Sequence, residues 1–124
     1  MARQQPLTID QPSCFRSGTS EEVSTTIARG RILTAGTGAD GVLRAAAASD
    51  LLVGVAVEDM APGTHQSYQS DGLAAVELGG TLAAGAAVTT DPVGRAVAAS
   101  VSAGTVVNLL GRIVQGGDSG DLGT

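Results

Sequence analysis

The sequence has almost no aromatic residues and no lysine, and both absences narrow what the protein can do. Phe15 and Tyr68 are the only aromatic residues, and tryptophan is absent. Sites for glycans or receptors normally recruit exposed aromatic rings for stacking, so this composition argues against such a site. The seven basic residues are all arginines. Lipoyl and biotinyl carrier modules need a lysine at a hairpin tip, so the absence of lysine excludes that function.

Clustered positive charge is also missing. The formal net charge is -5, and the arginines are scattered from Arg3 to Arg112. Nucleic-acid binding needs a basic footprint that releases counterions from phosphates. An acidic surface instead favours solubility and weakens adhesion to DNA. We therefore expect no nucleic-acid partner.

The sequence contains a single cysteine, Cys14, and a single histidine, His65. One cysteine cannot form an intrachain disulfide. One cysteine and one histidine cannot make a zinc site within the chain, and the acidic residues do not follow the spacing of an EF-hand. We expect no metal and no cofactor.

Long apolar runs are absent as well. None approaches the length of a membrane span, and residues 1–10 lack the apolar core of a signal peptide. These patterns predict a protein made in the cytoplasm with no membrane partner.

Small apolar side chains and glycine make up much of what is present. The hydrophobic residues are mostly Ala, Val and Leu, and there are 18 glycines. Burial contributes roughly 25 cal/mol per Å², so a core of small side chains is weakly stabilising. Association with copies of the same chain stabilises the folded state, so we expect self-association.

Short β-prone runs between turn signals predict an all-β fold. Asp40-Gly41, Pro62-Gly63 and Asp71-Gly72 separate runs rich in Val, Ile, Leu and Thr. Such spacing is typical of a sandwich or small barrel. The predicted strands are 31–34, 51–57, 74–78, 86–89 and 106–114. The alanine-rich segment 42–49 predicts two helical turns. Residues 1–12 are polar with two prolines and predict an extended arm.

An internal repeat is the most informative feature of the sequence. The segment 53–57 aligns with 110–114, and Thr26–Gly30 aligns with Thr81–Gly85. Farther back, 13–18 aligns with 67–72. We interpret residues 13–124 as a single β domain built from two copies of roughly 55 residues, near 13–66 and 67–124. Each unit is too small to close a core alone, so the two are expected to pack together.

Two motifs resemble catalytic or ligand-binding signatures. The segment 36–41 is a literal G-x-G-x-x-G, a pattern that binds dinucleotides when it joins a strand to a helix. A glycine-rich hairpin loop is the favoured interpretation, because no further β-α units follow. The second motif, Gly117–Gly120, matches a protease nucleophile loop, with His65 and Asp91 earlier in the chain. The residue after Gly120 departs from that pattern, so we expect no catalytic residue and no enzyme activity.

The chain resembles the decoration, or cement, proteins of tailed bacteriophage capsids. The resemblance rests on segments whose order and spacing match: 52–59, 61–63, 76–78, 82–88, 91–94 and 110–114, with Gly120 and 27–30. These are strand-and-turn patterns and cover most of the chain after residue 12. The resemblance implies a small β-barrel or β-tulip-like protein with an extended N-terminal arm.

The resemblance also implies a function and its partners. It implies a homotrimer that binds the major capsid protein on the outer surface of the virion and is made in the host cytoplasm. Interface anchors are usually aromatic residues or arginine, and an arm can add a strand to a partner sheet. The implied contact residues are Phe15, Arg16 and Tyr68, together with Arg3, Gln4, Gln5, Pro6, Leu7, Thr8 and Ile9.

Two alternatives stay open from the sequence. One is a β-rich fibre, spike or receptor-binding subunit. The other is a nucleotide-binding enzyme that uses the loop 36–41.

Overall fold

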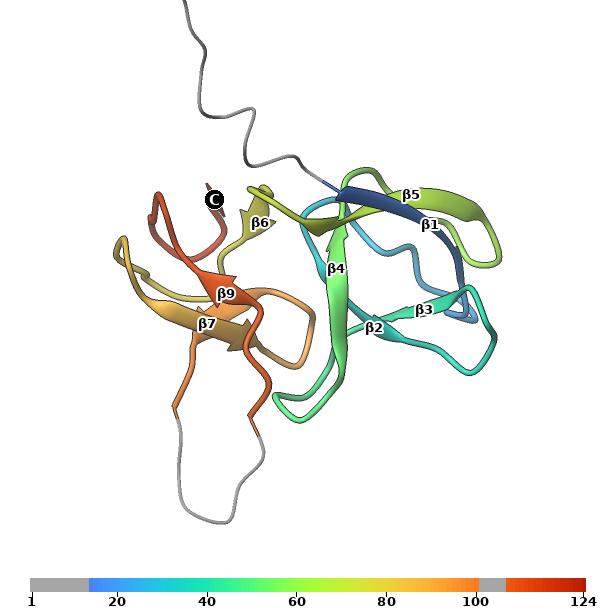
Figure 1. Ribbon diagram of the computed structural model, residues 1–124, viewed down its shortest axis with the longest axis horizontal. Helices are drawn as coiled ribbons and strands as arrows, with labels where there is room; N and C mark the ends of the chain where they lie inside the picture. The colour runs from blue at the N-terminus through green and yellow to red at the C-terminus, as the bar shows by residue number, and fades with distance from the viewer. Residues whose placement is uncertain (1–13, 101–106) are drawn as a thin grey trace, which may run out of the picture.

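The computed structural model describes residues 14–100 and 107–124, and this part of the chain contains only strands and turns (Figure 1). It confirms the predicted all-β fold. The strands are β1 (Cys14–Ser20), β2 (Ile32–Ala35), β3 (Gly41–Arg44), β4 (Leu52–Ala56), β5 (His65–Asp71), β6 (Val76–Glu77), β7 (Ala87–Thr90), β8 (Ala96–Ala98), β9 (Gly111–Arg112) and β10 (Leu122–Gly123).

The first five strands form a closed barrel with the order β1-β3-β2-β4-β5. β1 runs parallel to β3 and antiparallel to β5, and the other pairs are antiparallel. The barrel core contains Ile27, Leu33, Val42, Ala56, Met60 and Tyr68. Closure leaves no free sheet edge in this half, which removes a route to aggregation.

The second half is a more open arrangement of two small sheets, ordered β8-β7-β9 and β10-β6. Its core is shared with the barrel, because one buried cluster takes residues from both halves. Ile32, Ala45 and Val55 come from the barrel, and Val76, Leu78, Leu82, Val88, Ala96 and Ile113 come from the second half. The shared core explains how units built from small side chains bury enough apolar area.

The two halves repeat the same contacts. Leu33 pairs with Gly54 in the barrel, and Val88 pairs with Gly111 in the second half. The isolated bridges Ile27–Met60 and Leu82–Gly117 correspond in the same way. These matched contacts support the internal repeat, which stays a proposal. Strand pairing groups β5 with the first half, whereas the sequence boundary near 66/67 falls inside β5.

The predicted helix at 42–49 is wrong. Its first residues continue β3, where Val42 is buried in the barrel. The rest is a turn, in which an Asp50 carboxylate oxygen accepts the backbone N–H groups of Ala46 at 2.8 Å and Ala47 at 3.0 Å. Aspartate competes with helical hydrogen bonding in this way. The predicted strand 106–114 is also shorter in the structure, where only β9 forms among its described residues.

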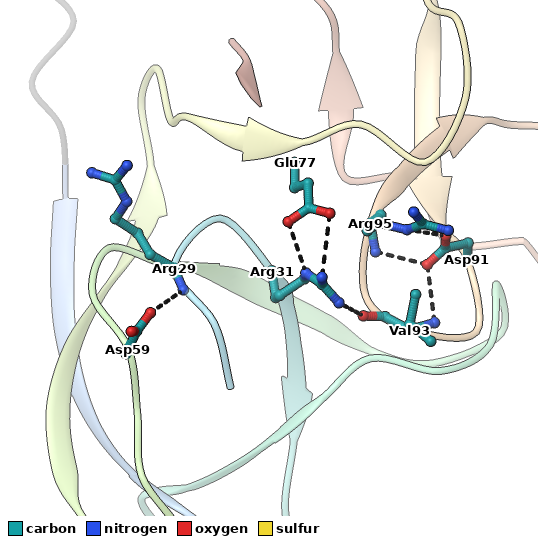
Figure 2. Close-up of polar contacts among 7 residues, drawn as sticks. All are labelled: Arg29, Arg31, Asp59, Glu77, Asp91, Val93 and Arg95. Carbon is teal, nitrogen blue, oxygen red and sulfur yellow. Dashed lines mark hydrogen bonds and ion pairs between the residues drawn. The ribbon is translucent and has the colours of Figure 1, made fainter. Parts of the chain in front are cut away.

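Arg31 forms one of the links between the two halves (Figure 2). The Arg31 guanidinium donates two hydrogen bonds of 3.2 Å to the Glu77 carboxylate and one of 2.8 Å to the Val93 carbonyl. The backbone reinforces the junction, because the Glu77 N–H donates to the Gly30 carbonyl at 2.9 Å. Bidentate arginine–carboxylate pairs fix geometry as well as charge. Arg31 therefore contributes to how the second half sits on the barrel, together with the shared core and hydrogen bonds such as that from the Ile32 N–H to the Gly94 carbonyl.

Candidate interaction surface

Arg16 and Tyr68 are brought together by the pairing of β1 with β5. They are direct cross-strand partners, and Phe15 pairs with Gln69 next to them. Neighbouring residues on a strand point to opposite faces. Arg16 therefore lies on the face of Tyr68, and Phe15 lies on the other.

Tyr68 is a core residue in this structure. Its side chain is 8% exposed and packs in the barrel cluster. The ring fits because two glycines face it, since a Cβ on Gly18 would lie 3.0 Å from Tyr68 Cε1 and one on Gly54 would lie 2.8 Å from Cδ2. Tyr68 thus has little surface to offer a partner, and its visible role is to support β1.

Phe15 and Arg16 are exposed. Phe15 keeps 57% of its surface open, which is unusual for one of only two aromatic residues. No carboxylate in the described part of the chain lies within ion-pairing distance of the Arg16 guanidinium; the ion pairs found there are Arg31–Glu77 and Arg95–Asp91. An exposed ring and an unpaired guanidinium on adjacent positions provide the residue types that anchor protein interfaces.

A groove at the barrel surface connects Arg16 with the β2–β3 hairpin. It has a volume of about 370 Å³ and is lined by Arg16, Ser17, Ala35, Val53, Tyr68 and residues 38–42. Arg16 contributes positive charge, and Asp40 contributes negative charge on the hairpin side. The other residues that line the groove have small or apolar side chains, apart from Tyr68.

The glycine-rich loop 36–41 is a hairpin loop that already holds an anion from its own chain. It joins antiparallel β2 and β3. The Glu21 carboxylate accepts the backbone N–H groups of Thr37 and Gly38, each at 2.8 Å, and the Thr37 hydroxyl at 3.0 Å. These backbone N–H groups hold the pKa of Glu21 below its ordinary value of 4.5. The favoured interpretation of this motif as a hairpin loop therefore agrees with the structure.

Two of the glycines in this loop make room for the carboxylate. A Cβ on Gly36 would lie 2.5 Å from the Glu21 carboxyl group, and one on Gly41 would overlap it. The dinucleotide motif uses glycine for close approach to a phosphate. Here the space beside these glycines is occupied by the Glu21 carboxylate, where that motif would hold a phosphate.

The residues of the protease-like pattern are engaged separately. His65 Nδ1 lies 2.9 Å from the Thr19 hydroxyl. The Asp91 carboxylate accepts N–H groups of Val93 and Arg95 and pairs with the Arg95 side chain at 2.9 Å. Ser119 lies in an exposed turn. Within the described residues these three side chains make no contact with one another, so no nucleophile–base pair is assembled.

Metal and membrane features can be stated for the described segments only. There, no cluster of three or more His, Cys, Asp or Glu side chains is arranged to hold a metal ion. No helix in residues 14–100 or 107–124 has the length and apolar character needed to cross a membrane.

Several of the predicted contact residues lie outside the described residues. Arg3, Gln4, Gln5, Pro6, Leu7, Thr8 and Ile9 all belong to this group. Sequence analysis also missed exposed apolar residues on the described surface, namely Val23, Leu51, Leu73, Leu109, Val114 and Leu122. Their sequence context gave no signal, because isolated leucines and valines in β segments are normally buried.

The comparisons with known proteins concern the fold. No protein-family model matches the sequence, and no curated protein matches it. A solved structure described as the head fiber gp8.5 N base of bacteriophage phi29 is similar, with a TM-score of 0.68 and 21% sequence identity. The similarity covers 90% of this chain and 91% of that chain. The chain therefore has the fold of that head fibre base over almost its whole length.

Proposed function

We propose that this chain is a structural protein of a bacteriophage virion that attaches to the outer surface of the head. The observation that carries the proposal is the similarity of fold to a head fibre base, which covers nearly all of both chains. The resemblance of the strand-and-turn motifs to capsid decoration proteins points in the same direction. The two comparisons share one class of protein, a surface component of the phage head.

The proposed contact surface consists of Phe15, Arg16 and the arm residues Arg3 to Ile9. Phe15 supplies an exposed ring, and Arg16 supplies a guanidinium with no partner in the described part of the chain. Their backbone is held rigidly, because β1 pairs with β5 along six residue pairs and also with β3. A rigid strand reduces the conformational entropy lost on binding.

In the first version of this function, the protein cements the lattice. A homotrimer would engage several major capsid subunits at once, so that weak identical contacts add by multivalency. Binding that favours the expanded lattice stabilises it by linkage. No chemical step is required.

In the second version, the chain is the base of a fibre. The similar structure is a head fibre base, which favours this version specifically. A base needs attachment but has no need to strengthen the lattice. The two versions share the contact surface and differ in the effect on capsid stability.

The test adds the purified protein to expanded heads that lack it. Electron microscopy is expected to show regular density on the outer surface, and light scattering of the free protein is expected to give a trimer. A cement raises the temperature at which heads release DNA, whereas a fibre base binds without that change. Absence of binding to heads at micromolar protein would refute the proposed function in both versions.

A further inference from the structure

The contact between the two halves uses a different surface on each half. The segment 30–32 of the first half lies in a slot of the second half, between Glu77 and the β7–β8 turn. The Glu77 N–H donates to the Gly30 carbonyl at 2.9 Å, and the Ile32 N–H donates to the Gly94 carbonyl at 2.7 Å. Figure 2 shows the arginine between them, which reaches Glu77. Such a contact is heterologous, because the two related units contribute unlike surfaces.

The second half has its own counterpart of the segment 30–32, at residues 85–87. The Gly30 N–H donates to the Ala56 carbonyl at 2.8 Å, and in the same way the Gly85 N–H donates to the Ile113 carbonyl at 2.6 Å. Both glycines have a φ of 89°. Gly85 is exposed, and the two alanines that follow it are half-buried. The segment 85–87 therefore presents at the surface the kind of backbone that 30–32 places in the slot.

The first half has a counterpart of the slot. In the second half the slot opens just before the parallel bridge Leu78–Ala96. In the first half, the parallel pairing of β1 with β3 starts at Thr19, whose N–H donates to the Asp40 carbonyl at 2.8 Å. The residues of β1 before Thr19 pair with β5 and not with β3, and the groove of about 370 Å³ opens there, between Arg16 and the β2–β3 hairpin. This groove thus lies where the second half has its filled slot.

The groove and the segment 85–87 have opposite charges beside them. Asp40 is exposed on the hairpin side of the groove. Arg112 lies on the segment 85–87, because its guanidinium donates a hydrogen bond of 2.9 Å to the Gly85 carbonyl. Neither side chain takes part in an ion pair within the described residues. Opposite charges on two such surfaces favour the correct pairing of the surfaces.

We propose that the groove of one copy receives the segment 85–87 of a second copy, as the second half receives 30–32 within the chain. Asp40 then pairs with Arg112 of the second copy. The small side chains of Ala35 and Ala39 on the groove wall allow a backbone to approach closely. Because the two surfaces differ, each copy binds one neighbour through its groove and another through its segment. Association continues head to tail until a ring closes.

This inference rests on the self-association that the lattice-binding version of the proposed function requires, and it names the surfaces that produce it. It is tested on the free protein, whereas the proposed function is tested by attachment to heads. The failure of one is therefore distinguishable from the failure of the other.

The first test reverses each charge in the full chain and measures self-association by analytical ultracentrifugation at micromolar protein. Asp40→Arg and Arg112→Glu are each expected to raise the dissociation constant by about tenfold or more, because like charges then meet at the contact. The double variant restores the pair in reversed form and is expected to return to within about threefold of wild type. Both side chains are exposed, so the fold is expected to be kept, and recovery by the double variant checks this.

The second test mixes the two single variants. The wild-type groove of one variant matches the wild-type segment of the other, and the two reversed surfaces also match. Native mass spectrometry is therefore expected to show complexes in which the two variants alternate. Glu58→Arg and Arg29→Glu are the matched controls, since they make the same charge changes at other exposed sites, and each is expected to associate like wild type.

The outcomes separate the possible occupants of the groove. Association of both single variants like wild type would place the contact between copies elsewhere and would overturn the proposal. A double variant as weak as the single ones would also overturn it, as would a wild type that stays monomeric. If Asp40→Arg weakens binding to heads and leaves self-association unchanged, the groove belongs to the head contact and the proposal is wrong.

Discussion

Arg31 and Glu77 form a bidentate ion pair that joins the barrel to the second half of the molecule. Both hydrogen bonds measure 3.2 Å, and the two side chains are 20% and 22% exposed. Partial burial strengthens such a pair relative to one on the open surface, while leaving either charge alone is costly. The pair adds a charged contact to the backbone hydrogen bonds that also join the two halves, such as the one of 2.7 Å from the Ile32 N–H to the Gly94 carbonyl.

Removing the Arg31 side chain is expected to lower the free energy of unfolding by about 2 kcal/mol, because hydrogen bonds to charged groups are lost and Glu77 loses its counterion. Arg29→Ala is the matched control. The Arg29 side chain is exposed and points away from this junction in Figure 2, so its loss is expected to change stability by less than about 0.5 kcal/mol. Urea unfolding measures both variants, and equal effects would remove the special role of Arg31.

The Glu21 carboxylate is expected to make stability depend on pH. Its pKa is lowered in the folded chain by the N–H groups of Thr37 and Gly38. The stabilisation is therefore present above the ordinary value of 4.5 and is lost as the pH falls through the lower folded pKa.

The check compares wild type with Glu21→Gln in urea unfolding from pH 7 to pH 3. The difference in stability is expected to be largest at neutral pH and to decrease as the pH falls and the carboxylate becomes protonated. Glu58→Gln, at an exposed glutamate, should follow the wild-type curve. A difference between wild type and Glu21→Gln that persists unchanged at pH 3 would show that the charge is not responsible.

Gly54 is expected to tolerate no side chain. A Cβ at this position would overlap the Gln69 carbonyl and lie 2.8 Å from Tyr68 Cδ2. Gly54→Ala should destabilise the protein by roughly 1–3 kcal/mol, the usual cost of overpacking a core. Gly80→Ala is the control, because its Cβ would meet open space. Thermal unfolding that is equal for the two variants would contradict the close approach of β4 and β5.

Arg16→Ala is expected to leave the fold intact and to weaken attachment to phage heads by about tenfold, as for an anchor charge at an interface. Arg29→Ala serves again as the control, since it removes the same charge from another exposed site. The measurement is binding to expanded heads at two salt concentrations. Unchanged binding of Arg16→Ala would exclude Arg16 from the contact surface. It would not contradict the attachment of the protein to the head through other residues.

Deleting residues 1–9 tests the proposed part of the arm in attachment. This change removes Arg3 to Ile9, which lie outside the barrel and the second half, so unfolding stability should be preserved while head binding weakens. Full head occupancy by the shortened protein would show that these residues are not part of the contact.

The strand content was predictable because turn residues divide the sequence into short β-prone runs. β2, β4 and β7 fall on their expected segments to within a residue or so, since alternating Val, Ile, Leu and Thr leave few other options. β1 and β5 were missed because their sequences are mostly polar, and their strand state comes from pairing with each other. The predicted helix failed because Asp50 closes a turn through side-chain hydrogen bonds.

The contact residues were predictable only by type. Arginine and aromatic residues are the usual anchors, and the sequence singled out Phe15, Arg16 and Tyr68. The structure separates these three candidates by exposure. The barrel places Phe15 and Arg16 at the surface, where they can contact a partner, and buries the ring of Tyr68.

The sequence by itself determined the small side chains, the absence of lysine and the scatter of the arginines, and its alternation of β-prone runs with turn residues indicated a β protein, because these are properties of the residues and of their order along the chain. Only the tertiary structure decided that Glu21 fills the glycine loop and that Arg31 reaches Glu77 across the two halves. Those relations join residues far apart in the chain, and barrel closure and the shared core bring them together.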